Sequence, residues 1–139
     1  MAHAHNFYTL KGYALLEHTA VTSSMEDYLE MIYRLHQDGQ PVRIKDLAEC
    51  LHVKPSSASK MAGNLKHQGL VVFEKYGTVS LTEGGLKLGE YLLFRHKVLH
   101  SFFCYVNQTS DELEQVEKVE HFMDPKTVYN IQKWLNKFT

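Results

Sequence analysis

The stretch PVRIKDLAECLHVKPSSASKMAGNLKHQGLVVFEKYGTVSLT, residues 41–82, decides the fold of this chain. Its first half predicts two helices, over residues 43–51 and 55–68, because apolar residues recur there at helical spacing. Pro55 suits the first turn of the second helix, where its missing N–H would have no partner, and Gly69 ends that helix. Two short helices joined by a tight turn indicate a helix-turn-helix.

The second half of the stretch predicts a hairpin. Residues 70–73 and 79–81 are rich in valine and other strand-forming residues, and residues 74–78 between them form the expected turn. A hairpin directly after a helix-turn-helix indicates a winged helix-turn-helix, whose second helix would enter the major groove of DNA.

Outside this stretch, from residue 23 onward, the pattern predicts helices. One ends near residue 37, and the others cover residues 83–106, 109–123 and 125–138. The expected helix starts are a capping box at Ser23 and Glu26, Thr82, a second capping box at Thr109 and Glu112, and Asp124 with Pro125. The helix over residues 83–106 is too apolar for its outer side to be fully solvated, which predicts a second subunit packed against it.

The composition is that of an ordinary globular domain. The 139 residues are 44% hydrophobic and 22% charged, and no apolar run approaches the roughly 18 residues of a membrane span. No signal peptide is evident, so we expect a cytoplasmic protein. We expect Cys50 and Cys104 to be reduced thiols buried inside helices.

The net charge of −1 is unevenly distributed along the chain. Residues 43–80 hold six basic and three acidic residues, a net charge of +3. Residues 109–139 hold four basic and six acidic residues, a net charge of −2. This modest asymmetry fits DNA at one end of the molecule and cations at the other.

Residue types that bind metals flank the helix-turn-helix on both sides. Asp27 and Glu30 are three residues apart on a helix, so their carboxylates point to one side. Glu117, Glu120 and His121 have the i, i+3, i+4 spacing that aims three side chains at one point. Neither group alone would hold a divalent ion well, so a metal site requires folding to bring them together.

His96, in the long helix, is a candidate for a further ligand. Carboxylates and imidazoles without a thiolate favour a first-row divalent ion that accepts oxygen ligands, such as Mn²⁺. The alternative is that these carboxylates are solvated, as is usual on amphipathic helices, because spacing alone does not show that the two groups meet.

Five motifs follow one another along the chain: SMEDYLE at residues 24–30, PSSASKM at residues 55–61, EKY at residues 74–76, FRH at residues 94–96 and VEH at residues 119–121. In this order and spacing they resemble the manganese-responsive repressors of the diphtheria-toxin-repressor family. The resemblance covers residues 23–138, and the chain looks like a short form of the family without a C-terminal SH3-like domain.

The resemblance implies a site for two Mn²⁺ ions per subunit. Its ligands would be Asp27, Glu30, His96, Glu117, Glu120 and His121. Glu117 and Glu120 would bridge the ions, and His121 would bind the second ion. Iron-responsive relatives have methionine in the place of Asp27 and cysteine in the place of Glu117, so the chain resembles the manganese type.

The implied function is a homodimeric repressor of manganese-uptake genes that binds a palindromic operator in double-stranded DNA when loaded with Mn²⁺. We expect base contacts from Pro55, Ser56, Ser57 and Lys60, and phosphate contacts from Arg43, Lys45 and Lys75. Helix capping is the alternative role for Ser56 and Ser57.

The expected fold is mainly α. Residues 23–82 would form a winged helix-turn-helix DNA-binding domain, and residues 83–139 a helical domain for dimerisation and metal binding. Residues 1–22 form an N-terminal extension that precedes the family's usual start. Gly77 is a second departure, since it lies one position earlier in the wing than the family pattern places it.

Two other functions stay open on the sequence. A small metallohydrolase could use a two-metal site to activate water, but the chain shows no separate general base and the helix-turn-helix would be unexplained. A winged-helix regulator could instead sense another metal, such as Fe²⁺, or an organic ligand.

Overall fold

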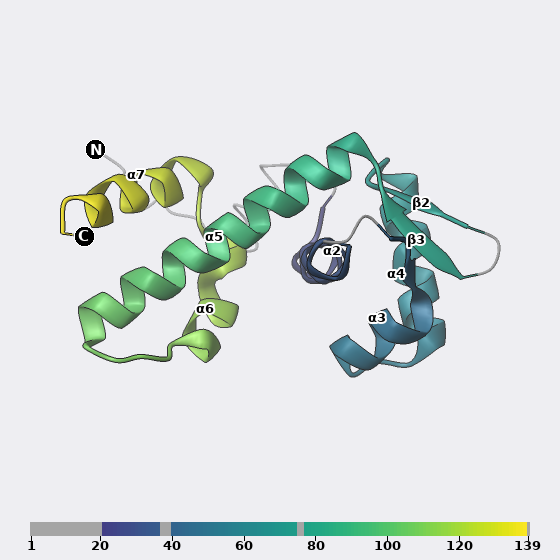
Figure 1. Ribbon diagram of the computed structural model, residues 1–139, viewed down its shortest axis with the longest axis horizontal. Helices are drawn as coiled ribbons and strands as arrows, with labels where there is room; N and C mark the ends of the chain where they lie inside the picture. The colour runs from purple at the N-terminus through teal and green to yellow at the C-terminus, as the bar shows by residue number, and fades with distance from the viewer. Residues whose placement is uncertain (1–20, 37–39, 75–76, 139) are drawn as a thin grey trace, which may run out of the picture.

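The computed structural model describes residues 21–36, 40–74 and 77–138, which form the mainly α fold that the sequence predicts (Figure 1). The elements are α2 (Ser23–Leu35), β1 (Val42–Arg43), α3 (Ile44–Leu51), α4 (Pro55–His67), β2 (Val71–Phe73), β3 (Thr78–Leu81), α5 (Glu83–Asn107), α6 (Leu113–Val119), the 3₁₀ turn η2 (Glu120–Phe122) and α7 (Pro125–Asn136). Most of the N-terminal extension and Lys75 of the wing lie outside the described residues. None of the described helices is long and apolar enough to cross a membrane.

The helices α3 and α4 and the β2–β3 hairpin form the predicted winged helix-turn-helix. β3 lies between β1 and β2 in an antiparallel sheet, with Val42 opposite Val79 and Arg43 opposite Thr78. The sequence pattern does not predict β1, because two residues are too few to show alternation. Pairing with β3, a contact distant in sequence, makes this segment a strand.

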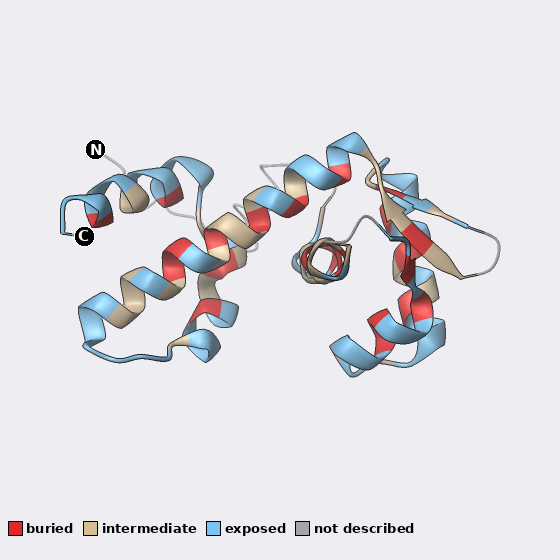
Figure 2. Cartoon of the chain, viewed as in Figure 1, coloured by how far each residue is buried: buried red, intermediate tan, exposed pale blue. Residues whose placement is uncertain are grey.

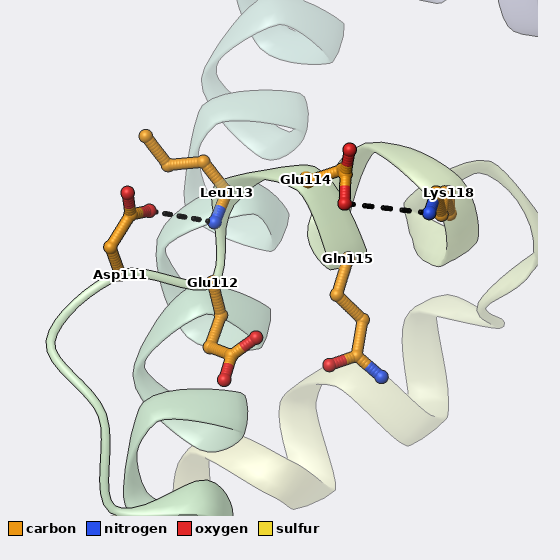
Figure 3. A pocket seen from close by; sticks show the side chains of 6 residues that line it. All are labelled: Asp111, Glu112, Leu113, Glu114, Gln115 and Lys118. Atoms are coloured by element: carbon orange, nitrogen blue, oxygen red, sulfur yellow. Dashed lines mark hydrogen bonds and ion pairs between the residues drawn. The ribbon is translucent and has the colours of Figure 1, made fainter.

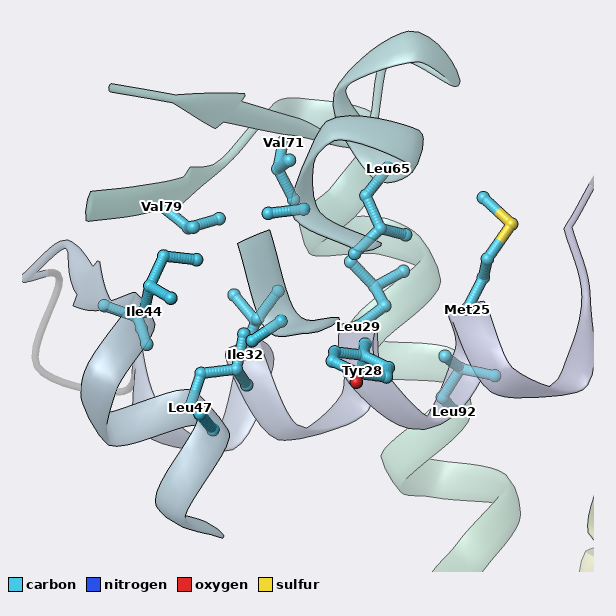
Figure 4. Close-up of a cluster of buried hydrophobic side chains, with 14 residues drawn as sticks. Met25, Tyr28, Leu29, Ile32, Ile44, Leu47, Leu65, Val71, Val79 and Leu92 are labelled. Atoms are coloured by element: carbon cyan, nitrogen blue, oxygen red, sulfur yellow. The ribbon is translucent and has the colours of Figure 1, made fainter. Parts of the chain in front are cut away.

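An apolar core fixes α2 to the winged helix-turn-helix. Leu29 and Ile32 of α2 are 0% exposed and pack in one cluster with Leu47 of α3, Leu65 of α4 and Val79 of β3 (Figure 4). Burying such a side chain contributes roughly 1.5–3 kcal/mol. Although α2 precedes the helix-turn-helix motif in sequence, it therefore belongs to the same packed unit.

The 25-residue helix α5 runs from the hairpin to the far end of the molecule (Figure 1). Thr82 caps it as predicted, by accepting a hydrogen bond from a backbone N–H in the first turn. α5 crosses α2 closely at Gly89, where a Cβ atom would lie 2.8 Å from Tyr33. Farther along, α5 packs against α7 in a second, smaller core around Val98 and Val128. Figure 2 shows buried segments on both of these helices.

The predicted capping boxes are wrong at both sites. Thr22 rather than Ser23 caps α2, since the Thr22 side chain accepts a backbone hydrogen bond in the first turn. At the second site, α6 begins at Leu113, and the Thr109 hydroxyl donates to the Glu112 carboxylate instead of capping the helix. Local capping patterns therefore misplaced the N-caps of two helices, by one residue (Ser23 instead of Thr22) and by three residues (Thr109 instead of Glu112).

The C-terminal helices follow the prediction only in part. A continuous helix to residue 123 was expected, but α6 ends at Val119 and the backbone tightens into η2. Pro125 opens α7 after Asp124, as predicted, although the Asp124 side chain makes no capping hydrogen bond. The last helix ends at Asn136.

The two cysteines lie in helices as expected and are free thiols. The prediction that both are buried is wrong, because Cys50 on α3 is exposed and Cys104 on α5 is only partly buried. Cys50 lies on the outer side of an amphipathic helix whose inner side is taken by Leu47 and Ala48.

Candidate metal centre

The two predicted ligand groups meet where three parts of the chain converge. The helix α2 contributes Asp27 and Glu30, α5 contributes His96, and the segment from α6 into η2 contributes Glu117, Glu120 and His121. All six residues predicted as ligands therefore lie together, although they come from opposite ends of the sequence.

Within the described residues, the candidate ligand atoms form two groups. One group comprises Asp27, Glu117, Glu120 and His121, and the other Glu30, His96 and Glu120; in each, the ligand atoms lie within 4.8 Å of one another. Glu120 belongs to both groups, which is the placement expected of a bridging carboxylate. Glu117, the second bridge expected from the resemblance, belongs only to the first group.

The Glu120 carboxylate is completely buried and only partly satisfied. Its Oε2 lies 3.2 Å from Nδ1 of His96. Its Oε1 accepts no hydrogen bond from the described residues, the nearby nitrogens of His121 and Arg95 being 3.9 Å and 4.0 Å away. An unpaired buried carboxylate oxygen is costly, roughly 1–3 kcal/mol or more. A divalent cation would fit this oxygen and the donors around it.

Burial, together with neighbouring carboxylates, raises the pKa values of two glutamates at the centre. Burial raises the pKa of Glu30 most, and the negative charge of Glu120 adds to this, against a lowering hydrogen bond from Arg34. Burial likewise raises the pKa of Glu117, helped by the charges of Glu120 and Asp27. A bound cation would relieve this repulsion and favour the ionised forms.

The two histidines are hydrogen-bonded to carboxylates. A hydrogen bond to Asp27 and a second one to Glu26 raise the pKa of His121 to about 10. The hydrogen bond to Glu120 raises the pKa of His96. A metal that binds through either ring must displace a proton, so metal binding and protonation compete at this centre.

Glu30 is also held by an arginine on its own helix. The Nε and Nη2 atoms of Arg34 donate to Oε2 of Glu30 over 3.0 Å and 2.6 Å. Both donors converge on one oxygen and balance the carboxylate's charge. This pair fixes the orientation of Glu30, which belongs to the second ligand group.

Sequence reasoning missed Glu26 and Arg95. Glu26 Oε1 lies 2.8 Å from Nδ1 of His121 and 3.2 Å from Nη2 of Arg95. The capping-box interpretation gave Glu26 a local role. A usable signal was present, since Glu26 is four residues before Glu30 on the same helix and Arg95 directly precedes His96.

The predicted DNA-contacting residues that the structure describes belong to neither ligand group. Pro55, Ser56, Ser57 and Lys60 are exposed on the first turns of α4, and Arg43 and Lys45 are exposed around the start of α3. The N-cap of α4 is Lys54, and it makes no side-chain capping bond. Neither Ser56 nor Ser57 is the N-cap, which is against the capping alternative for these hydroxyls.

A pocket of about 440 Å³ lies beside α6 (Figure 3). It is lined by Asp111, Glu112, Leu113, Glu114, Gln115 and Lys118, so most of its lining is charged. It shares no residue with the two ligand groups. Organic-ligand sites are mostly apolar, so this pocket does not support the alternative of an organic effector.

Comparison with known proteins identifies the family. Residues 20–79 match the family model described as iron dependent repressor, N-terminal DNA binding domain. The chain is 36% identical over 111 residues to the HTH-type transcriptional regulator MntR of Bacillus subtilis (strain 168), covering 79% of this chain and 78% of that protein. The chain belongs to the MntR family. The MntR of Geobacillus kaustophilus (strain HTA426) is 39% identical over 103 residues, or 73% of each chain.

Membership of the MntR family confirms the resemblance seen in the sequence. The family consists of HTH-type transcriptional regulators, so the chain is a DNA-binding regulator and the metallohydrolase alternative is wrong.

Solved structures agree on the fold. The manganese regulator SloR matches with a TM-score of 0.70 at 28% identity, covering 81% of this chain and 53% of that one. A manganese-dependent transcriptional repressor in complex with manganese matches with a TM-score of 0.72 at 28% identity, covering 81% of this chain and 52% of that one. The chain therefore spans about half the length of these two proteins.

Proposed function

We propose that the protein is a manganese-dependent repressor, which binds a palindromic operator as a homodimer when two Mn²⁺ ions occupy each subunit, and which represses manganese-uptake genes. The observation that carries the proposal is the pair of ligand groups that share the buried Glu120. In this proposal residues 23–82 act as the DNA-binding domain, and residues 83–139 as the domain for dimerisation and metal binding.

The donor set supports Mn²⁺. The proposed ligands are the carboxylates of Asp27, Glu30, Glu117 and Glu120 and the imidazoles of His96 and His121. Four ionised carboxylates carry the charge that two divalent ions neutralise. A set of oxygen and imidazole donors without thiolate suits Mn²⁺, which lies at the weak end of the divalent affinity order and depends on ligand number and geometry.

The position of α2 suggests how metal occupancy reaches the DNA-binding unit. Leu29 and Ile32 fasten α2 to the winged helix-turn-helix, while Asp27 and Glu30 of the same helix face α5 and η2. A bound divalent ion supplies the positive charge that holds these carboxylates together. The ligands then fix the orientation of the DNA-binding unit relative to α5, which reduces the entropy lost when two recognition helices dock on one operator.

Exposed side chains on α4 support its role as the recognition helix. Ser56, Ser57 and Lys60 stand free of the core near the N-terminal end of α4, where they could reach base edges in a major groove. The exposed Arg43 and Lys45 lie on the neighbouring helix start and would contact phosphates. The proposed contact from Lys75 rests on the sequence alone.

Exposed aromatic and aliphatic residues support the homodimer. At the far end of α5, Tyr105 is 42% exposed and Val106 55% exposed. The rings of Trp134 and Phe138 lie beside Tyr105 and meet each other at a tilt, with centroids 4.6 Å apart, and the two residues are 38% and 51% exposed. Such an apolar patch on a domain surface is typical of a contact with another protein chain.

The proposal is tested by DNA binding titrated with metal. DNA ligands are first selected from a random duplex pool with the protein and Mn²⁺, and binding is then measured by fluorescence anisotropy with Mn²⁺, Fe²⁺, Zn²⁺ and Co²⁺ in parallel. We expect Mn²⁺ to raise the affinity, and equilibrium dialysis to find two Mn²⁺ ions per subunit. DNA binding of equal strength with Mn²⁺ and with a chelator would contradict the proposal.

A further inference from the structure

Glu26 lies beside the candidate metal centre without belonging to either ligand group. It faces one edge of the His121 ring, with its Oε1 2.8 Å from Nδ1. The other ring nitrogen, Nε2, faces Asp27 Oδ1 at 3.0 Å. The two nitrogens of His121 therefore have different surroundings. Nε2 faces the first ligand group, whereas Nδ1 faces Glu26 at 2.8 Å and also lies 3.3 Å from Nη2 of Arg95, so the shorter contact of Nδ1 is with the carboxylate.

Glu26 is itself held by a buried arginine. Arg95 is 3% exposed, and its Nη2 lies 3.2 Å from the same Oε1 of Glu26. Its guanidinium carbon stands 5.9 Å from the ring centre of Tyr91. Because a guanidinium keeps its charge at all physiological pH values, Arg95 compensates the Glu26 carboxylate without help from a metal ion.

We infer that Glu26 is a positioning residue, which orients His121 and keeps its proton on Nδ1 so that Nε2 is free to bind a metal. This inference rests on the proposed metal function. A histidine that binds a metal through Nε2 keeps a proton on Nδ1, and a carboxylate that accepts this proton fixes the ring orientation and makes the ring a stronger ligand. Arg95 in turn fixes the carboxylate.

The three residues join the same parts of the chain as the ligands do. Glu26 belongs to α2, Arg95 to α5 and His121 to η2. The hydrogen bonds that set the tautomer of His121 therefore also connect the DNA-binding unit, to which α2 belongs, with α5 and η2. Loss of Glu26 would free the ring orientation of His121 and remove a contact between α2 and the other two elements, while all six proposed ligands are still present.

Variants at Glu26 test this inference through metal affinity. Glu26→Ala removes the acceptor, and Glu26→Gln keeps an amide oxygen that can still accept from Nδ1 but lacks the charge. Glu114→Gln is the matched control, because Glu114 is an exposed carboxylate three residues before Glu117 on α6. Mn²⁺ binding is measured from the electron paramagnetic resonance signal of the free ion, and thermal unfolding with a chelator checks that each variant folds.

We expect Glu26→Ala to weaken Mn²⁺ binding about 10–100-fold, Glu26→Gln to weaken it less, and Glu114→Gln to match the wild type. A Glu26→Ala variant with wild-type affinity would overturn the inference. Failure of the wild type itself to bind Mn²⁺ would instead overturn the proposed function, so the two failures are distinguishable.

The ring proton gives a second readout, which a merely structural ion pair would not change. In protein loaded with Co²⁺, the N–H proton of a metal-bound histidine appears as a strongly shifted, exchangeable proton resonance. We expect the His121 resonance, assigned by its loss in His121→Ala, to be present in the wild type and Glu114→Gln. In Glu26→Ala it should vanish through exchange with water, and in Glu26→Gln it should move; an unchanged resonance in both would contradict the assigned role. If Glu26→Ala does not fold, Glu26→Gln decides.

Discussion

The helix α2 is held on two sides by opposite kinds of interaction. Leu29 and Ile32 are buried among apolar side chains of the winged helix-turn-helix, whereas Glu26, Asp27 and Glu30 meet charged groups of α5, α6 and η2. Apolar packing responds little to pH or metal ions, but a joint built from carboxylates and histidines responds to both. We therefore expect the packing of α2 on the winged helix-turn-helix to be insensitive to pH and metal ions, and we call it the constant core. We expect the contacts of Glu26, Asp27 and Glu30 with α5, α6 and η2 to depend on both, and we call these contacts the adjustable joint.

Glu120→Gln should break the adjustable joint while sparing the constant core, and we expect the largest effect from it. The amide preserves the volume and a contact with His96, but it removes the carboxylate that both ligand groups share. Stimulation of DNA binding by Mn²⁺ should be abolished in a titration by fluorescence anisotropy. Size-exclusion chromatography should show the same oligomeric state as the wild type, because the proposed subunit contact is apolar. A variant that responds to Mn²⁺ like the wild type would show that the ligand assignment is wrong.

Leu29→Ala should weaken the constant core while sparing the metal ligands of the adjustable joint. Removing a fully buried leucine leaves a cavity, which lowers the free energy of unfolding by about 2–5 kcal/mol. The rise in melting temperature on adding Mn²⁺ should persist, since the ligands are untouched. Leu35→Ala on the same helix is the control: Leu35 is 37% exposed, and its loss should change stability by about 0.5 kcal/mol or less. The free energy of unfolding of both variants is measured in urea. An equal decrease in the two variants would contradict the assignment of Leu29 to the apolar core.

The sequence predicts features that depend on local signals, but not features that depend on contacts distant in sequence. The winged helix-turn-helix was predictable because its signals are local: apolar spacing, Pro55 at a helix start and a hairpin between two short strands. The strand β1 was not, because two residues adopt extended structure only through pairing with β3. The six candidate ligands were found from spacing together with the family resemblance.

Spacing alone could not bring the two ligand groups together. Their meeting depends on the close crossing of α5 with α2 at Gly89, which is a tertiary feature. Glu26 shows the converse error, since a local capping pattern was preferred over a contact with His121, 95 residues away in the sequence. Residues of an adjustable joint are hard to assign because each also fits an ordinary local role.

Raising the pH should increase the affinity for Mn²⁺ and decrease the stability of the metal-free protein. The pKa of His121 is raised to about 10 from its ordinary 6.5. The resulting stabilisation of the metal-free protein is therefore complete below pH 6.5 and is lost as the pH rises toward 10. Mn²⁺ must displace the same proton, so its affinity should rise by up to about ten-fold per pH unit between pH 6.5 and 8. Isothermal titration calorimetry in buffers of different ionisation enthalpy should detect the released proton; enthalpies independent of the buffer would contradict this coupling.

Asp27→Met should change how well Mn²⁺ activates DNA binding relative to Fe²⁺. A thioether in place of the carboxylate removes a hard, charged ligand, and Mn²⁺ depends most on the number and geometry of such ligands. We expect DNA binding to need several-fold more Mn²⁺, while the response to Fe²⁺ under anaerobic conditions changes less. If Asp27 serves only to hold the His121 ring, activation curves for the two ions should shift in parallel.

Lys45→Ala should have the smallest effect, because it touches neither the core nor the joint. Lys45 is exposed on the first turn of α3, where a phosphate contact would position the protein without reading bases. Affinity should fall similarly for selected and unrelated DNA, and the slope of log affinity against log salt should flatten by about one unit per subunit. Lys118→Ala on α6 is the control, since Lys118 is an exposed lysine paired with Glu114 in the helical half. Its salt slope should equal that of the wild type. A loss in Lys45→Ala confined to one base pair of the selected DNA would assign Lys45 to base reading, and so would place part of the sequence specificity on α3 rather than on α4 alone.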